Sequence, residues 1–449
     1  MLPEQHYSAS GHQIKGASKY RSSWTIPIVY TIFFIIFFQE PFIRLFPDTH
    51  IRYIDEFFVG TVFSAALIYS IISRKVSVIF LITIFAIFYM VIISYAGSPR
   101  GISTIFKQSI INWKFFIFSI ACIYILKRGG KGRSFIYFFF FLFAVSLLGF
   151  LMNWIFQERF LEIFGVSPMY RNNILRIQGF QIKPNDLALH LSIIYLYVVL
   201  LTKYSYSASF LLLTSVVFFS LIYMTGSRTA LSIIPLTLLM YILFKKKWAV
   251  LLAVSVAATI MMVYFSGALI DMIEMTGDNI NELRNIEDTK YIRGIMIYYG
   301  AKLMMDNFPI GTGSATFGTV ESKGSPVYDS LGLSGMNFFE DMIGVYDSNL
   351  ASIMGEFGVA GILLFYISLF AIYRRAILIS GNNSNKRLYL VILLIFSLLV
   401  SVVNPLFMYS YNGLLFAIAF FLVGFDNGKH KLKPTLLSIG RPPSGGHAE

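Results

Sequence analysis

The chain has 449 residues, of which 56% are hydrophobic, 17% aromatic and only 13% charged. A water-facing surface needs more charged residues than this, so the composition excludes a soluble globular protein and predicts an integral membrane protein. The single cysteine, Cys122, excludes a disulfide within the chain and a thiol-based metal site, and the net charge of +13 is assigned to loops at a membrane surface rather than to nucleic-acid binding.

The hydrophobic segments predict an all-α polytopic fold of about twelve transmembrane helices. The hydrocarbon core of a bilayer is roughly 30 Å thick and needs about 20 apolar residues in a helix, or fewer where neighbouring helices shield it. The expected helices lie near residues 24–40, 57–73, 76–95, 110–126, 134–154, 186–202, 208–223, 229–244, 248–265, 349–372, 388–403 and 411–425.

The basic residues indicate the orientation of these helices, because cytoplasmic loops carry an excess of Lys and Arg. Basic clusters occur at Arg74 and Lys75, and in KRGGKGR, KKK and KHKLK further along the chain, and all of them fall on one side. We therefore expect both termini in the cytoplasm and the active site outside. The predicted division is a cytoplasmic segment 1–23, helices 1–9 over 24–265, a large periplasmic loop 266–348, helices 10–12 over 349–425 and a cytoplasmic tail 426–449.

Two basic residues precede the fourth expected helix on the outer side. Lys107 and Arg100 are candidates for a phosphate contact. Long basic side chains beside a membrane helix more often place their charge at the lipid–water interface, and we favour that interpretation for both residues.

The stretch RIQGFQIKPNDLALHLS leads a charged, turn-rich segment into an apolar helix. Pro184 suits the first turn of that helix, and the unpaired N–H groups of a helix N-terminus attract anions. Arg176, Lys183 and Asn185 are therefore candidates for substrate binding, and the alternative is an ordinary helix start with interfacial anchors. We interpret His190, inside the apolar run, as a buried and hydrogen-bonded histidine rather than a catalytic one.

An arginine interrupts a long hydrophobic block in the sequence MTGSRTALS. Gly226 and the flanking hydroxyl residues predict a helix break before Arg228, and irregular backbone at membrane depth must line protein or a cavity. A guanidinium is permanently charged, and its five donors form a fork that suits carboxylate or phosphate. Arg228 is thus a candidate for an anionic substrate, with interfacial anchoring as the alternative.

The large outer loop is expected to be partly helical. Apolar residues recur at helical spacing over 291–305, and the following sequence NFPIGTG ends that helix. The segment 321–346 is rich in Gly, Ser and Pro, so we predict a mobile loop there. Arg284 and Arg293 are the candidates for substrate binding within this region.

Polar residues also mark the point where the chain re-enters the membrane. Asn349, Ser352 and Glu356 form one stripe on the entering helix. Asp347 or Ser348 suits the N-cap, and for either residue a cap competes with a catalytic role. A carboxylate at the position of Glu356, inside an apolar helix, is costly and usually has a partner or a task. Asn349 and Glu356 are therefore candidates for substrate binding.

Arginine-bearing segments thus converge on one side of the membrane, beside an acid. This pattern is typical of a site for a lipid-linked phosphate, because arginines neutralise charge that develops on a departing diphosphate. No metal-binding motif, Walker A sequence or Rossmann glycine pattern occurs, so we expect no metal and no cofactor.

Four of these motifs resemble a known family. They are RxxGFxxxPN at 176–185, SRTAL at 227–231, Arg293 followed by DNFPIGTGSATFG at 306–318, and NLxxxxxEFGVxG at 349–361. Their order and spacing are similar to those of the O-antigen polymerase and O-antigen ligase superfamily, which includes the Wzy-type polymerases of surface polysaccharides. The resemblance covers residues from about 176 to 370.

The resemblance implies an inverting, metal-independent glycosyltransferase of the GT-C type in the bacterial inner membrane. Such an enzyme transfers a glycan from undecaprenyl diphosphate to an acceptor sugar on the periplasmic or outer face. Arg228 and Arg293 match arginines of the family motifs and are candidates for the diphosphate. Membrane lipid and the lipid-linked oligosaccharides, as donor and acceptor, are the implied partners, and a chain-length regulator stays open as a further one.

The resemblance also bears on the choice of acceptor. The ligases usually carry a histidine, followed by an asparagine, nine residues before the glutamate of the E-x-G segment, whereas this chain has Asp347 and Ser348 there. We therefore favour a repeat-unit polymerase, with Asp347 as the catalytic base, over a ligase that transfers glycan to a lipid A–core acceptor. A flippase for the same lipids is the main alternative of another class, but charge in flippases is distributed through both halves of a central cavity.

Overall fold

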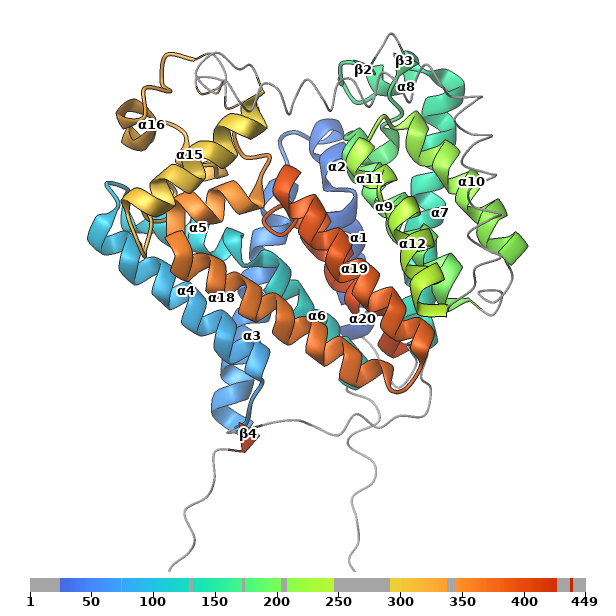
Figure 1. The fold of residues 1–449 in the computed structure, drawn as a ribbon, viewed down its shortest axis with the longest axis horizontal. Helices are drawn as coiled ribbons and strands as arrows, with labels where there is room; N and C mark the ends of the chain where they lie inside the picture. The colour runs from blue at the N-terminus through green and yellow to red at the C-terminus, as the bar shows by residue number, and fades with distance from the viewer. Residues whose placement is uncertain are drawn as a thin grey trace, which may run out of the picture.

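The computed structural model describes residues 25–425, apart from 74, 129–131, 172–173, 203–207, 246–290, 337–338, 340–341 and 343, together with 437–438. The expected helix at 248–265 and the candidate Arg284 lie outside these residues. Over the described part the fold is almost entirely helical (Figure 1), which confirms the predicted all-α class.

The helices follow one another in the order shown in Figure 1. Those before the central gap are α1 (Thr25–Phe37), α2 (Gln39–Leu45), α3 (Ile54–Ser73), α4 (Val78–Gly97), α5 (Ile102–Asn112), α6 (Lys114–Arg128), α7 (Gly132–Phe156), α8 (Glu158–Glu162), α9 (Pro184–Leu201), α10 (Ala208–Met224), α11 (Arg228–Leu231) and α12 (Ile233–Lys245). Those after it are α15 (Ile292–Asp306), α16 (Pro326–Ser330), α18 (Asn349–Ser380), α19 (Ser384–Val403) and α20 (Ser410–Phe425).

Short elements connect these helices. Three are 3₁₀ turns, η1 (His50–Tyr53), η2 (Gly179–Gln181) and η3 (Val320–Ser322). Two pairs of short antiparallel strands complete the described chain: β1 (Lys75–Val76) pairs with β4 (Leu437–Ser438), and β2 (Tyr170–Arg171) pairs with β3 (Ile174–Leu175).

Seven helices of the described chain are long and apolar enough to cross a membrane, or up to nine if each of two bent pairs is one span. The bent pairs are α1 with α2, at 72°, and α5 with α6, at 54°. The helix expected at 110–126 is therefore not continuous. The bend follows Trp113, whose indole N–H points to the sulfur of Met90 at 2.8 Å, while the N–H of Phe115 donates to the carbonyl of Phe407 at 3.3 Å.

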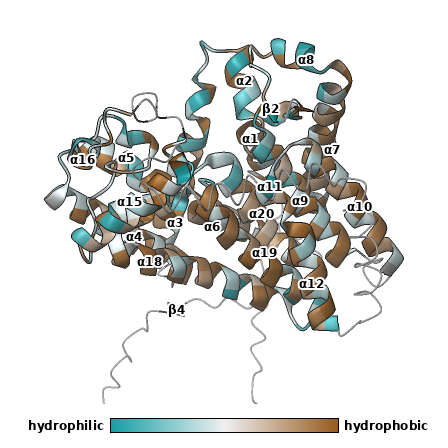
Figure 2. Ribbon diagram, turned by 45° about the horizontal axis from the view of Figure 1, so that its top comes forward, coloured by the Kyte–Doolittle hydropathy of each residue, from teal (hydrophilic) through white to brown (hydrophobic). Residues whose placement is uncertain are grey.

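The centre of the bundle is one large hydrophobic core. Most residues of α20 and α9 are fully buried within it, so these two helices are enclosed by the others rather than facing lipid. Hydrophobic residues cover most of α12, α18, α19 and α20, whereas hydrophilic ones gather on α2 and α8 (Figure 2).

The large loop has a small core of its own. Leu333, Tyr328 and Val345 pack with Met296 of α15 and Phe317 in a second hydrophobic cluster. The prediction of a mobile loop over 321–346 is therefore wrong for the described residues, because their apolar side chains pack beneath the polar ones. The predicted helix over 291–305 is confirmed as α15.

The two ends of the bundle differ in what they carry. α2, α8, α16 and the β2–β3 hairpin lie at one end, and β1 with β4 lies at the other, where α6 and α12 also finish (Figure 1). The described segments expected to face outward thus gather at the end opposite β1 and the C-terminal ends of α6 and α12. This arrangement agrees with the predicted grouping of the loops, and the face toward the periplasm stays a prediction.

Candidate active site

A basic corner forms where the segment after the β2–β3 hairpin packs against the break between α10 and α11. The N–H of Ile177 donates to the carbonyl of Met224 at 3.0 Å, and the Nε of Arg176 donates to the carbonyl of Thr225 at 2.9 Å. The guanidinium of Arg171 donates to the carbonyl of Gly226. Gly226 has a φ of 66°, and a Cβ at this position would lie 2.9 Å from the Nε of Arg176. The break therefore depends on a glycine.

Four arginines from three parts of the chain interact electrostatically in this corner. Burial, followed by repulsion from Arg228 and Arg293, lowers the pKa of Arg171. Burial, with repulsion from Arg171 and Arg293, lowers the pKa of Arg176 to about 10. Arg293 thus lies near enough to act on Arg171 and Arg176, and Arg228 near enough to act on Arg171, whereas the shared role predicted for Arg176, Arg228 and Arg293 stays a prediction. We refer to these four residues as the arginine cluster.

Sequence reasoning missed Arg171, which ends the short strand β2 and belongs to no motif. Its guanidinium is half-buried and is held by a backbone carbonyl. Within the described residues neither Arg171 nor Arg176 makes an ion pair. Both side chains thus keep their full charge for an anion. The only sequence-level indication was the first arginine of YRNNILR, five residues before Arg176.

A cavity of about 800 Å³ lies beside the arginine cluster. Its walls come from α2, η1, α3, α5, α6, η3, the segment 169–186 and the loop 404–412. Five predicted site residues line it: Lys107, Arg176, Lys183, Asn185 and Asp347. This volume is within the range of small-molecule sites, and its position joins the basic corner to a wall rich in tyrosine and amide side chains.

The start of α9 presents polar side chains to this cavity, as the sequence indicates. Lys183 is the N-cap residue and Pro184 occupies the first turn. The Nζ of Lys183 lies 2.9 Å from Glu40 and 2.7 Å from the hydroxyl of Tyr409. The side-chain oxygen of Asn185 accepts a hydrogen bond from Arg176 at 3.0 Å. The helix start therefore helps to orient the arginine cluster.

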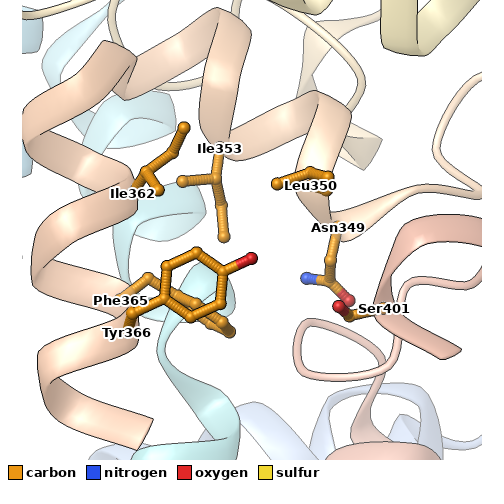
Figure 3. Close-up of a pocket in the computed structure, with 7 residues that line it drawn as sticks. All are labelled: Asn349, Leu350, Ile353, Ile362, Phe365, Tyr366 and Ser401. Carbon is orange, nitrogen blue, oxygen red and sulfur yellow. The ribbon is translucent and has the colours of Figure 1, made fainter. Parts of the chain in front are cut away.

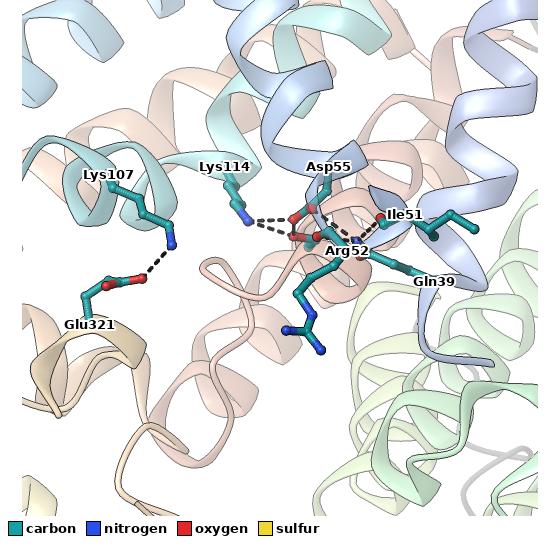
Figure 4. A network of polar contacts seen from close by, with 8 residues as sticks. Gln39, Ile51, Arg52, Asp55, Lys107, Lys114 and Glu321 are labelled. Atoms are coloured by element: carbon teal, nitrogen blue, oxygen red, sulfur yellow. Dashed lines mark hydrogen bonds and ion pairs between the residues drawn. The ribbon is translucent and has the colours of Figure 1, made fainter. Parts of the chain in front are cut away.

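The opposite wall contains matched ion pairs (Figure 4). Lys114 lies 2.6 Å from Asp55, both nearly inaccessible, and Ser410 also contacts this carboxylate. Lys107 pairs with Glu321 at 2.8 Å. These contacts connect α3 to α6 and α5 to η3.

Arg100 makes hydrogen bonds within the protein that the sequence did not predict. Its guanidinium donates to the carbonyls of Ala315 at 3.0 Å and Glu321 at 3.1 Å, and also to that of Lys323. It does not line the cavity. Arg100 therefore holds the loop that follows α15 instead of facing a phosphate in the cavity.

Asp347 and Ser348 divide the two roles that the sequence left open. The hydroxyl of Ser348 accepts a hydrogen bond from the N–H of Ala351 at 3.1 Å and caps α18. Asp347 lines the cavity, and its carboxylate pairs with Arg293 of α15 at 3.0 Å. Each side chain is about one-third exposed, at 33% for Asp347 and 30% for Arg293. The pair therefore joins the arginine cluster to the cavity.

Glu356 supports the loop after α15. Its carboxylate is completely buried and accepts hydrogen bonds from the Thr319 hydroxyl at 2.6 Å, the Thr316 N–H at 3.0 Å and Asn112 at 3.2 Å. Two residues later, Gly358 breaks the helical conformation with a φ of 59°. Glu356 does not itself line the cavity, although its partner Thr319 does, so its predicted role in binding substrate gains no support from its position.

Asn349 and His190 are likewise engaged inside the protein. The side-chain oxygen of Asn349 accepts from the N–H of Phe407 at 2.9 Å. The same residue lines a separate cavity of about 10 Å³ with Tyr366 and Ser401 (Figure 3), too small for a sugar. The Nδ1 of His190 lies 3.1 Å from the Ser146 hydroxyl in a buried site, which confirms the predicted buried, hydrogen-bonded histidine.

The comparison with known families supports the resemblance seen in the sequence. Residues 213–366 match a family model described as O-antigen ligase. This range begins in α10 and ends in α18, and it contains Arg228, Arg293, Asp347 and Glu356. No curated protein matches the chain. In the described part of the chain, no group of three or more His, Cys, Asp or Glu side chains could hold a metal ion.

Proposed function

We propose that the chain polymerises the repeat units of a surface polysaccharide, and the match of residues 213–366 to a family model described as O-antigen ligase supports a glycan-transfer reaction of this kind. In this reaction a glycan is transferred, with inversion and without a metal, from undecaprenyl diphosphate to the terminal sugar of a second lipid-linked unit. The site lies on the periplasmic or outer face of the inner membrane.

The arginine cluster beside the cavity carries this proposal. A departing prenyl diphosphate gains negative charge as the bond to the sugar breaks, and fixed guanidinium groups stabilise that charge. Arg171 and Arg176 are held by backbone carbonyls of the α10–α11 break, so their orientation is fixed before substrate binds. We assign Arg228 and Arg293 to the diphosphate as well.

Asp347 lies between the arginine cluster and the cavity. We propose that it orients Arg293, with which it pairs at 3.0 Å. Its assignment as the base that activates the acceptor stays a prediction. The same holds for substrate binding by Lys107, Lys183, Asn185, Asn349, Glu356 and Arg284 and for the recruitment of a chain-length regulator.

The second candidate function is ligation to a lipid A–core acceptor, which the description of the matching family favours. Against it stands the pair Asp347 and Ser348 at the position where the resemblance leads us to expect histidine and asparagine. A flippase is less compatible with charges gathered at one end of the bundle, because translocation needs a site reached from both sides.

The glycan profile of cells that lack the protein tests the proposal. A polymerase predicts that single repeat units accumulate on the outer face or on the final acceptor. A ligase predicts long chains that stay on the lipid carrier, and a flippase predicts lipid-linked units retained at the cytoplasmic face. Purified protein in detergent should lengthen lipid-linked units taken from these cells, and a complete lack of lengthening would contradict a polymerase.

A further inference from the structure

A buried carboxylate lines the cavity and has no role in the site described so far. Asp186 lies in the first turn of α9, next to Asn185, which binds Arg176 of the arginine cluster. Its residue is only 5% exposed, yet it belongs to the cavity lining. We propose that Asp186 is the catalytic base that accepts the proton of the acceptor hydroxyl. This inference rests on the proposed glycosyl transfer.

Asp186 differs from four of the other five acids that line the cavity, because the described residues supply it with no ion pair. Asp55, Glu40, Glu321 and Asp347 each lie within 3.0 Å of a lysine or arginine nitrogen. Within the described residues Asp186 makes no such pair, and one oxygen accepts a hydrogen bond from the amide of Asn412 at 3.2 Å. No described residue donates to its other oxygen, so that oxygen is open to the cavity.

Glu56 is the other acid of the lining that makes no ion pair within the described chain. It lies on α3, and its charge acts on Lys107, on the wall away from the arginine cluster. A base must lie within hydrogen-bond reach of the attacking hydroxyl, and that hydroxyl must face the carbon bonded to the diphosphate. Asp186 adjoins Asn185, the partner of Arg176, so we assign the base to Asp186 rather than to Glu56.

The surroundings of Asp186 also suit a sugar. The hydroxyl of Tyr411 donates to the backbone carbonyl of Asp186 at 3.2 Å. Tyr409, Asn412 and Gln181 line the same part of the cavity. Aromatic faces and amide groups are suited to bind a sugar, because its ring offers both apolar C–H groups and hydroxyls. The acceptor is therefore expected to place its terminal sugar between α9 and α20.

In the proposed step, the acceptor oxygen forms a bond to the anomeric carbon while its proton moves to Asp186. The bond from that carbon to the diphosphate oxygen breaks, and the departing prenyl diphosphate keeps the electron pair. The guanidinium groups of the arginine cluster stabilise its charge. Asp186 then loses its proton to water in the cavity, so that no other reactant is needed.

A purely structural role is the alternative. An acid in the first turn of a helix interacts favourably with the helix dipole, and the bond to Asn412 fixes α20 to α9. This alternative predicts lower thermal stability for any substitution of Asp186 and gives no reason for a small carboxylate to restore activity.

The test uses purified full-length variants and lipid-linked repeat units from cells that lack the protein. Asp186→Asn keeps the shape and the contact with Asn412, and should lower the polymerisation rate by about 10²–10⁴-fold. Binding of undecaprenyl diphosphate, which lacks the sugar, should equal that of the wild type. Asp329→Asn, which alters an exposed acid of α16 at the same end of the bundle, is the matched control and should polymerise normally.

Asp186→Ala leaves a space that formate can enter, so added formate should restore part of the activity of this variant. Formate should restore no activity in Asp186→Asn, where the amide fills the space. Asp347→Asn, assayed in parallel, should keep more activity than Asp186→Asn. The inference is overturned if Asp186→Asn polymerises at the wild-type rate, if it no longer binds undecaprenyl diphosphate, or if formate leaves Asp186→Ala inactive. Failure of the proposed function looks different, because the wild-type protein itself would then lengthen no glycan.

Discussion

The two walls of the cavity carry their charges in opposite ways. On one wall the two lysines are each paired with an acid, in the buried pair of Lys114 and Asp55 and the more exposed pair of Lys107 and Glu321 (Figure 4). On the other wall, Arg171 and Arg176 donate to backbone carbonyls and to an asparagine, and the described residues supply neither with an ion pair.

This difference separates charges that maintain the fold from charges that are available to a ligand. A paired cation gives little attraction to a further anion, because its partner already neutralises it. Cations held by neutral groups repel one another, and here that repulsion contributes to the lowered pKa of Arg171 and Arg176. A bound diphosphate would relieve the repulsion, which is the physical reason to place the leaving group at the arginine cluster.

The largest effect is expected from breaking the buried pair of the first wall. Asp55→Asn leaves the Lys114 ammonium buried without its acid, and removing one partner of such a pair destabilises a protein by about 3–5 kcal/mol. Thermal unfolding in detergent should show a large decrease in the melting temperature. The double variant Asp55→Leu with Lys114→Met removes both charges and should recover most of that loss. Equal stability of the single variant and the wild type would contradict a structural role for this pair.

On the second wall the expected effect is on turnover. Arg228→Lys keeps a positive charge but loses the guanidinium fork, and the loss of one such donor costs about 10²–10³ in kcat. Polymerisation of lipid-linked repeat units in detergent measures it, and the melting temperature should change little. Arg387→Lys, an exposed arginine at the start of α19, is the matched control. Surface glycans of unchanged length in cells carrying Arg228→Lys would disprove the assignment.

A smaller effect is expected from moving the arginine cluster without changing its charge. Gly226→Ala adds a Cβ that would lie 2.9 Å from the Nε of Arg176 and also strains the positive φ, a backbone cost of about 1–3 kcal/mol. Gly324→Ala has the same strain, at a φ of 65°, but nothing within 4 Å of the added carbon. Both variants should lose similar stability, and only Gly226→Ala should bind undecaprenyl diphosphate more weakly. Equal binding of undecaprenyl diphosphate by the two variants would show that the position of Arg176 does not affect diphosphate binding.

The elements that the sequence predicted are those set by local chemistry. Hydropathy located most of the long helices to within a few residues, although it missed α5 and ended α18 eight residues early. The expected position of Pro184 in the first turn of α9 is confirmed, and Ser348 is the one of the two expected cap residues that caps α18. The gathering of Arg176, Arg228 and Arg293 followed from topology, because loops on one side of a bundle meet at one end.

The features that escaped prediction depend on contacts between distant segments. A hydropathy window averages over Trp113 and its neighbours, so it cannot detect the bend between α5 and α6. The apolar residues of 321–346 form a core with residues of α15, and this contact between distant segments cannot be read from the sequence. Glu356 looked functional because a carboxylate in an apolar helix needs partners, and those partners, Thr316 and Thr319, come from a loop about forty residues away.

The smallest effect is expected at Lys107, where the two readings of the sequence can be separated. Lys107 pairs with Glu321, and the two side chains are 46% and 25% exposed, so this bridge should contribute only about 0–1 kcal/mol to stability. If Lys107 only links α5 to η3, Lys107→Ala and Glu321→Gln should both polymerise at nearly the wild-type rate. If Lys107 binds phosphate, the two variants should diverge: Lys107→Ala should bind undecaprenyl diphosphate more weakly, whereas Glu321→Gln, which frees the ammonium, should bind it more tightly. Because Lys107 and Lys114 of this wall are each paired with an acid, we expect the first outcome, in which Lys107 only links α5 to η3.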